Sequence, residues 1–124
     1  MKICITAQGN TLASQVDARF GRCTWFIILD TETRQFEAVD NAHAGSTGGA
    51  GIQSGQLMSE KGVKALLTGN VGPNAFQTLQ AAGIEVITGV AGTVEQVIEK
   101  YNKGEYRPAG AATVDSHFGM KGGN

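Results

Sequence analysis

The sequence predicts one α/β domain in which helices cover both faces of a mixed five-stranded sheet. After residue 50, helical patterns alternate with short apolar strands, and this alternation is typical of right-handed parallel crossovers. Before residue 50, the tight turn at 31–34 separates two strands and indicates an antiparallel hairpin. The chain has 124 residues, 41% of them hydrophobic, which suits a single domain with one core.

The first half of the chain contains three expected strands. Residues 2–7 form a central strand, because residues 3–5 are consecutive apolar residues without a polar face. A polar loop that contains D-A-R-F-G-R follows at 8–23. The strands of the hairpin are expected at 24–30 and 35–40.

Three helices alternate with two strands in the rest of the chain. Pro73 suits the first turn of a helix, and T-V-E-Q from Thr93 matches a capping box. Gly62, Gly83 and Gly104 follow helical patterns, where a left-handed residue commonly ends a helix. The expected segments are a helix at 50–61, a strand at 63–68, a helix from 73, a strand at 84–88 and a helix from 93.

A sheet in the strand order 3-2-1-4-5, with the second strand antiparallel, satisfies both the hairpin and the crossovers. This three-layer α/β/α arrangement is the ribonuclease H-like motif. Its switch point lies between the first and fourth strands, and ligands of open α/β sheets bind beyond the strand ends at such a point. We expect three loops to converge there: residues 8–23, the glycine-rich loop at 45–51 and residues 69–72.

The glycine-rich loop reads G-S-T-G-G-A-G and runs directly into an expected helix. Its backbone N–H groups and the helix N-terminus together suit an anion. The glycines expected to contact such a ligand are Gly45, Gly48, Gly49 and Gly51.

Several enzyme classes fit the sequence poorly. No glycine is followed by Lys-Ser or Lys-Thr, as a P-loop requires, and 49–54 has serine where a dinucleotide fingerprint has its third glycine. The first strand, K-I-C-I-T-A, lacks the carboxylate that a two-metal nuclease needs. With two histidines and no nucleophile beside a base, we expect no catalytic residues and no enzymatic activity.

Composition limits the partners and the compartment. The net charge of −1 gives no general affinity for nucleic acid or an anionic membrane. The longest apolar run, 25–29, is too short for a membrane span, and the N-terminus is unlike a signal peptide. We therefore expect a cytoplasmic protein whose two cysteines are thiols.

Four segments together resemble a known family: D-A-R-F-G-R before a strand that ends at Asp30, N-A-H-A-G-S-T-G-G-A-G, L-L-T-G-N-V-G-P-N-A and A-A-G-I-E-V. Over about residues 2–106 the chain is similar to the dinitrogenase iron–molybdenum cofactor biosynthesis family, as a small stand-alone member. That family includes cofactor-carrying nitrogenase accessory proteins and the C-terminal domain of the cofactor-assembly radical enzyme. The resemblance implies the ribonuclease H-like fold and, in some members, binding of iron–sulfur or iron–molybdenum clusters. We expect one nitrogenase-accessory-like domain at 1–106 and a flexible tail at 107–124.

A metal–sulfur cluster is an anion held by thiolates or imidazoles, and its sulfides accept hydrogen bonds. Cys23 is one candidate ligand; alternatively, it is a small hydrophobic residue at the start of a strand. Arg19 and Arg22 are expected to contact the anion, and would lower the Cys23 pKa if they face the thiol. His43 and His117 are further candidate ligands, with solvated loop and tail positions as the alternatives.

Other polar residues near the expected site have structural explanations. Asp17 is expected to accept loop N–H bonds and to pair with Arg19. Asn70 is a candidate cofactor contact that alternatively caps the next helix. Cys4 and Phe20 are expected in the core.

The residues and the resemblance favour a non-catalytic binding or carrier protein for an iron–sulfur or iron–molybdenum-type cluster or its precursor. Cluster donor and acceptor proteins would be its partners. Two alternatives remain: an interaction module of the same fold without a cluster, or a phosphometabolite-binding protein that uses the glycine-rich loop.

Overall fold

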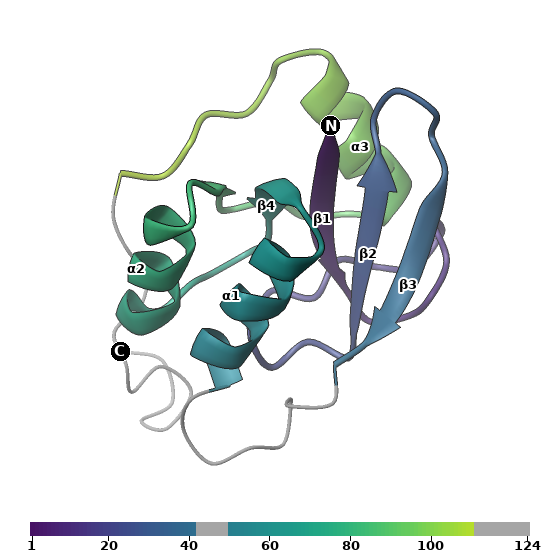
Figure 1. The fold of residues 1–124 in the computed structure, drawn as a ribbon. Helices are drawn as coiled ribbons and strands as arrows, with labels where there is room; N and C mark the ends of the chain where they lie inside the picture. The colour runs from purple at the N-terminus through teal and green to yellow at the C-terminus, as the bar shows by residue number, and fades with distance from the viewer. Residues whose placement is uncertain (42–49, 111–124) are drawn as a thin grey trace.

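The computed structural model describes residues 1–41 and 50–110 (Figure 1). Strands and helices follow one another in the predicted order, and most ends lie within one residue of the prediction. The elements are β1 (Lys2–Ala7), β2 (Trp25–Asp30), β3 (Phe36–Asp40), α1 (Ala50–Glu60), β4 (Val63–Leu67), α2 (Pro73–Ala81), β5 (Glu85–Ile87) and α3 (Val94–Asn102).

The five strands form one sheet in the order β3-β2-β1-β4-β5. β2 is antiparallel to both β1 and β3, whereas β1, β4 and β5 are parallel to one another. The predicted strand order and the antiparallel second strand are therefore confirmed. β2 and β3 lie on one side of β1, and β4 and β5 lie on the other, so the switch point is between β1 and β4. Because β1 and β4 are parallel, their carboxyl ends lie side by side.

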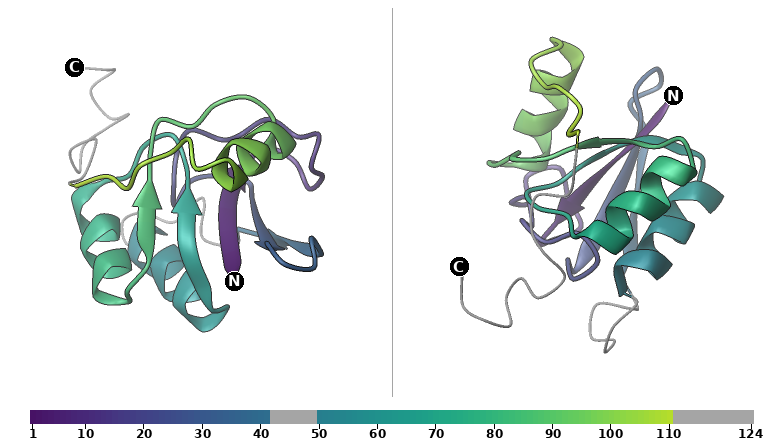
Figure 2. Two further views of the ribbon diagram at one scale, coloured as in Figure 1. Left: turned by 90° about the horizontal axis from the view of Figure 1, so that it is seen from above. Right: turned by 90° about the vertical axis from the view of Figure 1, so that its left-hand side faces the viewer.

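Helices cover both faces of the sheet, with α3 on one face and α1 and α2 on the other (Figure 2). Because side chains alternate along a strand, β1 supplies both cores. Ile3 and Ile5 pack with Val97 on the α3 side, and Cys4 packs with Met58 on the other. All five side chains have no solvent exposure, which explains why a continuous apolar run marks this central strand.

Local sequence signals define the helix ends. At the start of α3, Gln96 N–H donates to Thr93 Oγ1 at 3.2 Å, and Thr93 N–H donates to Gln96 Oε1 at 2.9 Å. The predicted capping box is therefore confirmed. Gly62, Gly83 and Gly104 follow the three helices with φ values of 75°, 74° and 72°, as expected for residues that end a helix.

Asn70 does not cap α2, so that alternative is wrong. The helix begins at Pro73, and its N-cap is Gly72, which provides no side-chain hydrogen bond. Asn70 lies two residues before the cap, and its backbone instead pairs with the loop that follows β1.

The chain continues to contact the sheet after α3. Figure 1 shows it passing from α3 toward α2. Ala109 N–H donates to Val86 O at 2.7 Å, and the half-buried Ala109 side chain packs against the core under α1 and α2. Residues 111–124 lie outside the described part, so the flexible tail at 107–124 stays a prediction.

Candidate functional site

The candidate site begins where β1 and β4 end at the switch point of the sheet. The segment 16–20 lies between these two ends and bridges Ala7 on one side and Asn70 on the other. Asn70 N–H donates to Ala18 O at 2.7 Å, and Phe20 N–H donates to Asn70 O at 3.2 Å. The D-A-R-F segment thus extends the sheet beyond β1 and β4.

A buried polar cluster fixes the start of this segment. The Thr6 hydroxyl donates to Asp17 O at 2.6 Å and lies 2.8 Å from the Thr68 hydroxyl. Asp17 N–H in turn donates to Thr6 O at 2.9 Å. Because both threonines are fully buried, these bonds are shielded from water and hold Asp17 firmly at the end of β1.

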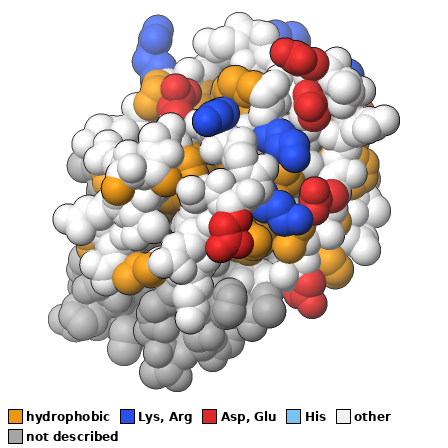
Figure 3. All heavy atoms as spheres, viewed as in Figure 1, with side chains coloured by type: hydrophobic (Ala, Val, Ile, Leu, Met, Phe, Trp, Pro, Cys, Tyr) orange, Lys and Arg blue, Asp and Glu red, His pale blue; other side chains and the backbone are white. Residues whose placement is uncertain are grey.

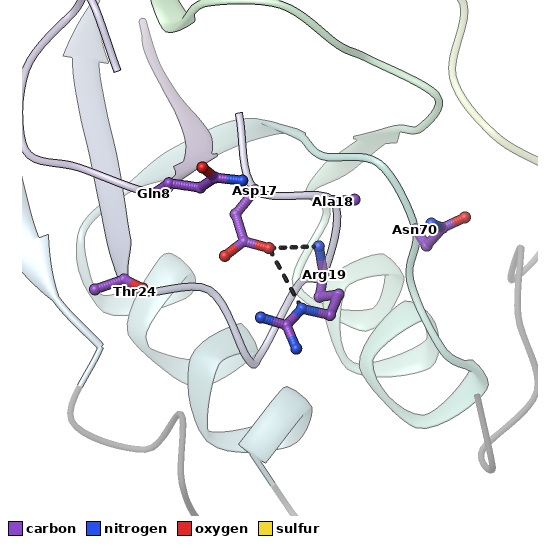
Figure 4. A pocket seen from close by; sticks show the side chains of 6 residues that line it. All are labelled: Gln8, Asp17, Ala18, Arg19, Thr24 and Asn70. Carbon is purple, nitrogen blue, oxygen red and sulfur yellow. Dashed lines mark hydrogen bonds and ion pairs between the residues drawn. The ribbon is translucent and has the colours of Figure 1, made fainter. Parts of the chain in front are cut away.

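A pocket opens above this segment (Figure 4). Its volume is about 590 Å³, which is in the range of small-ligand sites. Residues from the ends of β1 and β4, from the intervening segment and from the start of β2 line it: Gln8, Asp17, Ala18, Arg19, Thr24 and Asn70. The position is the one that open α/β sheets use for ligands.

Asp17 and Arg19 define the electrostatics of the pocket. The Asp17 carboxylate is only 8% exposed; its Oδ1 accepts Arg19 N–H at 3.1 Å and lies 3.5 Å from Arg19 Nε. The predicted structural role of Asp17 is therefore confirmed. The Arg19 side chain is 58% exposed, so its terminal amino groups extend toward solvent at the pocket. Together with the Gln8 and Asn70 amides, it offers hydrogen-bond donors that suit an anion.

The structure brings two predicted contacts together, since Arg19 and Asn70 pair through their backbones and both line the pocket. Arg22 is exposed and is not among the residues that line the pocket, and Gly51 lies in the first turn of α1. The other candidates lie outside the described residues: Gly45, Gly48, Gly49, His43 and His117. The binding roles of all these residues stay predictions.

Cys23 lies in the core under α1 and α2 and has no solvent exposure. The Asn41 amide donates to its carbonyl at 2.9 Å and lies 3.9 Å from its sulfur. Burial, with a smaller contribution from the Asp17 charge, raises the pKa of the Cys23 thiol to about 12. The condition for a lowered pKa, that Arg19 and Arg22 face the thiol, is not met, because Arg19 pairs with Asp17 and Arg22 is exposed.

Sequence reasoning missed the pocket residues Ala18 and Thr24 and the polar pair Thr6 and Thr68. The two threonines are 62 positions apart and meet through the parallel pairing of β1 with β4. No local motif marks such a contact. The usable signal is positional: each threonine lies within one residue of the carboxyl end of a strand that borders the switch point.

Within residues 1–41 and 50–110, no three His, Cys, Asp or Glu side chains cluster in a way that could hold a metal ion. Over the same residues, no helix has the length and apolar character of a membrane span. The polar groups that line the described part of the site are the Arg19 guanidinium, the Gln8 and Asn70 amides, the Thr24 hydroxyl and the Asp17 carboxylate, which is paired with Arg19.

Comparisons with known proteins agree with this architecture. The apo form of the orange protein from Desulfovibrio gigas is 42% identical and superposes with a TM-score of 0.89, covering 91% of this chain and 96% of its own. A NifB-like protein from Thermotoga, solved by NMR, is 38% identical with a TM-score of 0.80 and coverages of 91% and 97%.

A sequence relative, an uncharacterised protein of Methanocaldococcus jannaschii, is 28% identical over 108 residues, which are 85% of this chain and 88% of that protein. The model of a family described as "Dinitrogenase iron-molybdenum cofactor" matches residues 1–104. This match includes the sheet, all three helices and the pocket. The chain therefore belongs to the dinitrogenase iron–molybdenum cofactor family.

Proposed function

We propose that the protein binds and carries a metal–sulfur cluster of the iron–sulfur or iron–molybdenum type, or a precursor of one, without catalysing a reaction itself. Family membership supports a role in cofactor handling. The observation that carries the proposal is the donor-lined pocket at the switch point, with the exposed Arg19 guanidinium beside it.

The chemistry of the pocket suits an anionic cluster. Cluster sulfides accept hydrogen bonds, and a guanidinium provides both donors and positive charge. α1 and α2 both begin on the side of the sheet where β1 and β4 end (Figure 1), and a helix N-terminus carries partial positive charge. The buried Asp17 carboxylate is already paired with Arg19 and therefore repels an incoming anion less than a free carboxylate would.

We place the first contacts of the cluster on Arg19 and Asn70, together with the glycine loop residues Gly45, Gly48, Gly49 and Gly51. Cys23, His43 and His117 remain candidate metal ligands. Ligation by Cys23 would require its thiol to leave the core and lose its proton, whereas Arg19 can act from its present position.

The proposed partners are proteins that donate clusters to this chain or accept them from it. The solved apo form of the orange protein supports a carrier function, because the term apo describes a protein that also exists with a bound group. A carrier must release its cargo. Contacts made by hydrogen bonds at an open pocket allow that release more readily than several metal–thiolate bonds.

Anaerobic loading with iron and sulfide tests the proposal. After desalting, the wild-type protein should keep a visible chromophore and bound iron. Arg19→Ala should retain at least about tenfold less, because a charge-assisted hydrogen bond is lost. Arg34→Ala is the matched control: it removes the same charge in the β2–β3 turn, at the opposite edge of the sheet, and should behave like the wild type.

Loss of all iron from the desalted wild-type protein would refute cluster binding. If the chromophore is kept, Cys23→Ala and His43→Ala test the candidate metal ligands. A variant that retains as much iron as the wild type would exclude the residue that it replaces. The rival phosphometabolite function predicts instead that inorganic phosphate shifts the amide resonances of Arg19 and Asn70.

A further inference from the structure

We propose that Gly69 is a positioning residue of the pocket: its lack of a side chain lets the 17–20 segment approach closely enough to hold Arg19 beside Asn70. The inference rests on the proposed function only in taking Arg19 and Asn70 as ligand contacts. Gly69 itself does not line the pocket.

The contact between Gly69 and Ala18 leaves no room for a Cβ. A Cβ built on Gly69 would lie 2.7 Å from Ala18 Cα, and 2.8 Å from both Ala18 Cβ and Ala18 O. Real Cβ atoms essentially never approach other atoms so closely. Two of the three atoms are backbone and the third is attached directly to it, so no side-chain rotation relieves the contact and the segment itself must move.

Both sides of this contact are held in place. Gly69 O accepts Gly89 N–H at 2.9 Å, which anchors Gly69 to the loop after β5. Asp17 is anchored by its bonds to Thr6. A displacement caused by a side chain at 69 is therefore directed into Ala18 and the residue that follows it, Arg19.

The hydrogen bonds that such a displacement would break join the 17–20 segment to residue 70. Ala18 O accepts Asn70 N–H at 2.7 Å, and Asn70 O accepts Phe20 N–H at 3.2 Å, with Arg19 between them. Loss of this pairing would shift the backbone of Arg19 relative to that of Asn70, and both residues line the pocket. Binding sites lose affinity when their groups are misplaced by about 1 Å.

Gly72 provides a matched control three residues further along the same loop. A Cβ at Gly72 meets nothing within 4 Å, and its φ of −81° and ψ of 170° are open to any residue. Gly69 is likewise not among the glycines with positive φ. Alanine at either position is therefore free of backbone strain, and the difference between the two variants isolates the contact with Ala18.

The experiment compares Gly69→Ala with Gly72→Ala in the full chain. In the metal-free protein, NMR should show faster hydrogen exchange at the Asn70 and Phe20 amides and a shifted Arg19 Hε resonance for Gly69→Ala alone. After anaerobic loading with iron and sulfide, Gly69→Ala should retain at least about tenfold less iron than Gly72→Ala. Both variants should still unfold in one cooperative transition.

Equal exchange rates and equal iron retention in the two variants would overturn the inference. If the wild type retains no iron, the proposed function fails, and the exchange rates and the Arg19 resonance still decide the role of Gly69. If Gly69→Ala does not fold, the double variant with Ala18→Gly removes one of the three close contacts. Because the two backbone contacts remain, the double variant should fold with faster exchange at the Asn70 and Phe20 amides than in the wild type, and wild-type exchange at both amides would contradict the inference.

Discussion

Cys4 and Cys23 are buried thiols on the same side of the sheet, and each has a raised pKa mainly because of burial. The Cys23 pKa is about 12 in the folded protein against an ordinary value of 9.0. Above about pH 9 the unfolded chain releases a proton that the folded chain keeps. We therefore expect the free energy of unfolding of the metal-free protein to fall as the pH rises from 9 toward 12.

Urea unfolding at about pH 7 and about pH 10 checks this expectation. Cys23→Ala should start from a lower stability because it removes buried volume, and should lose less between the two pH values. An equal loss in the variant and the wild type would show that another group causes the alkaline decrease.

The pairing of Asp17 with Arg19 could be predicted from residue types close in sequence. The raised pKa of Cys23 could not be predicted in this way, because it depends on burial by elements far along the chain. The same holds for Gly69, whose role depends on a close approach to Ala18, a residue 51 positions earlier in the chain. Sequence shows which groups are present, and the fold decides which of them meet.

At the scale of single elements, α3 offers a direct test of its capping box. Thr93→Ala removes the hydroxyl that accepts Gln96 N–H and should lower the free energy of unfolding by about 1 kcal/mol. Thr93→Ser keeps an acceptor at the same position and should lose much less. Urea denaturation measures both changes; equal losses would mean that the threonine methyl group, and not the cap, contributes the stability.

The elements were predictable because their signals are local. The capping box, Pro73 and the apolar run of β1 each act within a few residues. Asn70 shows the limit of such signals: asparagine before G-P suits a helix cap, yet Gly72 takes that position. The backbone of Asn70 is instead used by the segment after β1, a long-range pairing that local preference does not contain.

Both cores share one sheet, so we expect the whole molecule to unfold as a unit. Ile5→Ala changes the α3 side and Leu66→Ala the opposite side, and each should cost about 2–5 kcal/mol. Fluorescence of Trp25, the single tryptophan, and far-UV circular dichroism should give coincident transitions in both variants. Separate transitions in Leu66→Ala would show that α1 and α2 melt independently of α3.

The surface agrees with the nearly neutral net charge. Figure 3 shows acidic and basic side chains interspersed on the described part of the visible face, without one large area of a single sign. Lys61 and Glu37 form one exposed ion pair at 3.0 Å, joining the end of α1 to β3. The described part of this face therefore offers no extended area of one charge sign to a charged partner.

The hydrogen bond from Ala109 to Val86 limits strand pairing between molecules at the outer strand β5. β5 is an outer strand of the sheet. The unpaired backbone N–H and C=O groups of an outer strand can form hydrogen bonds with a strand of another molecule. Ala109 already bonds to Val86, the middle residue of β5. The segment that follows α3 thus leaves less of this outer strand available for pairing with a strand of another molecule.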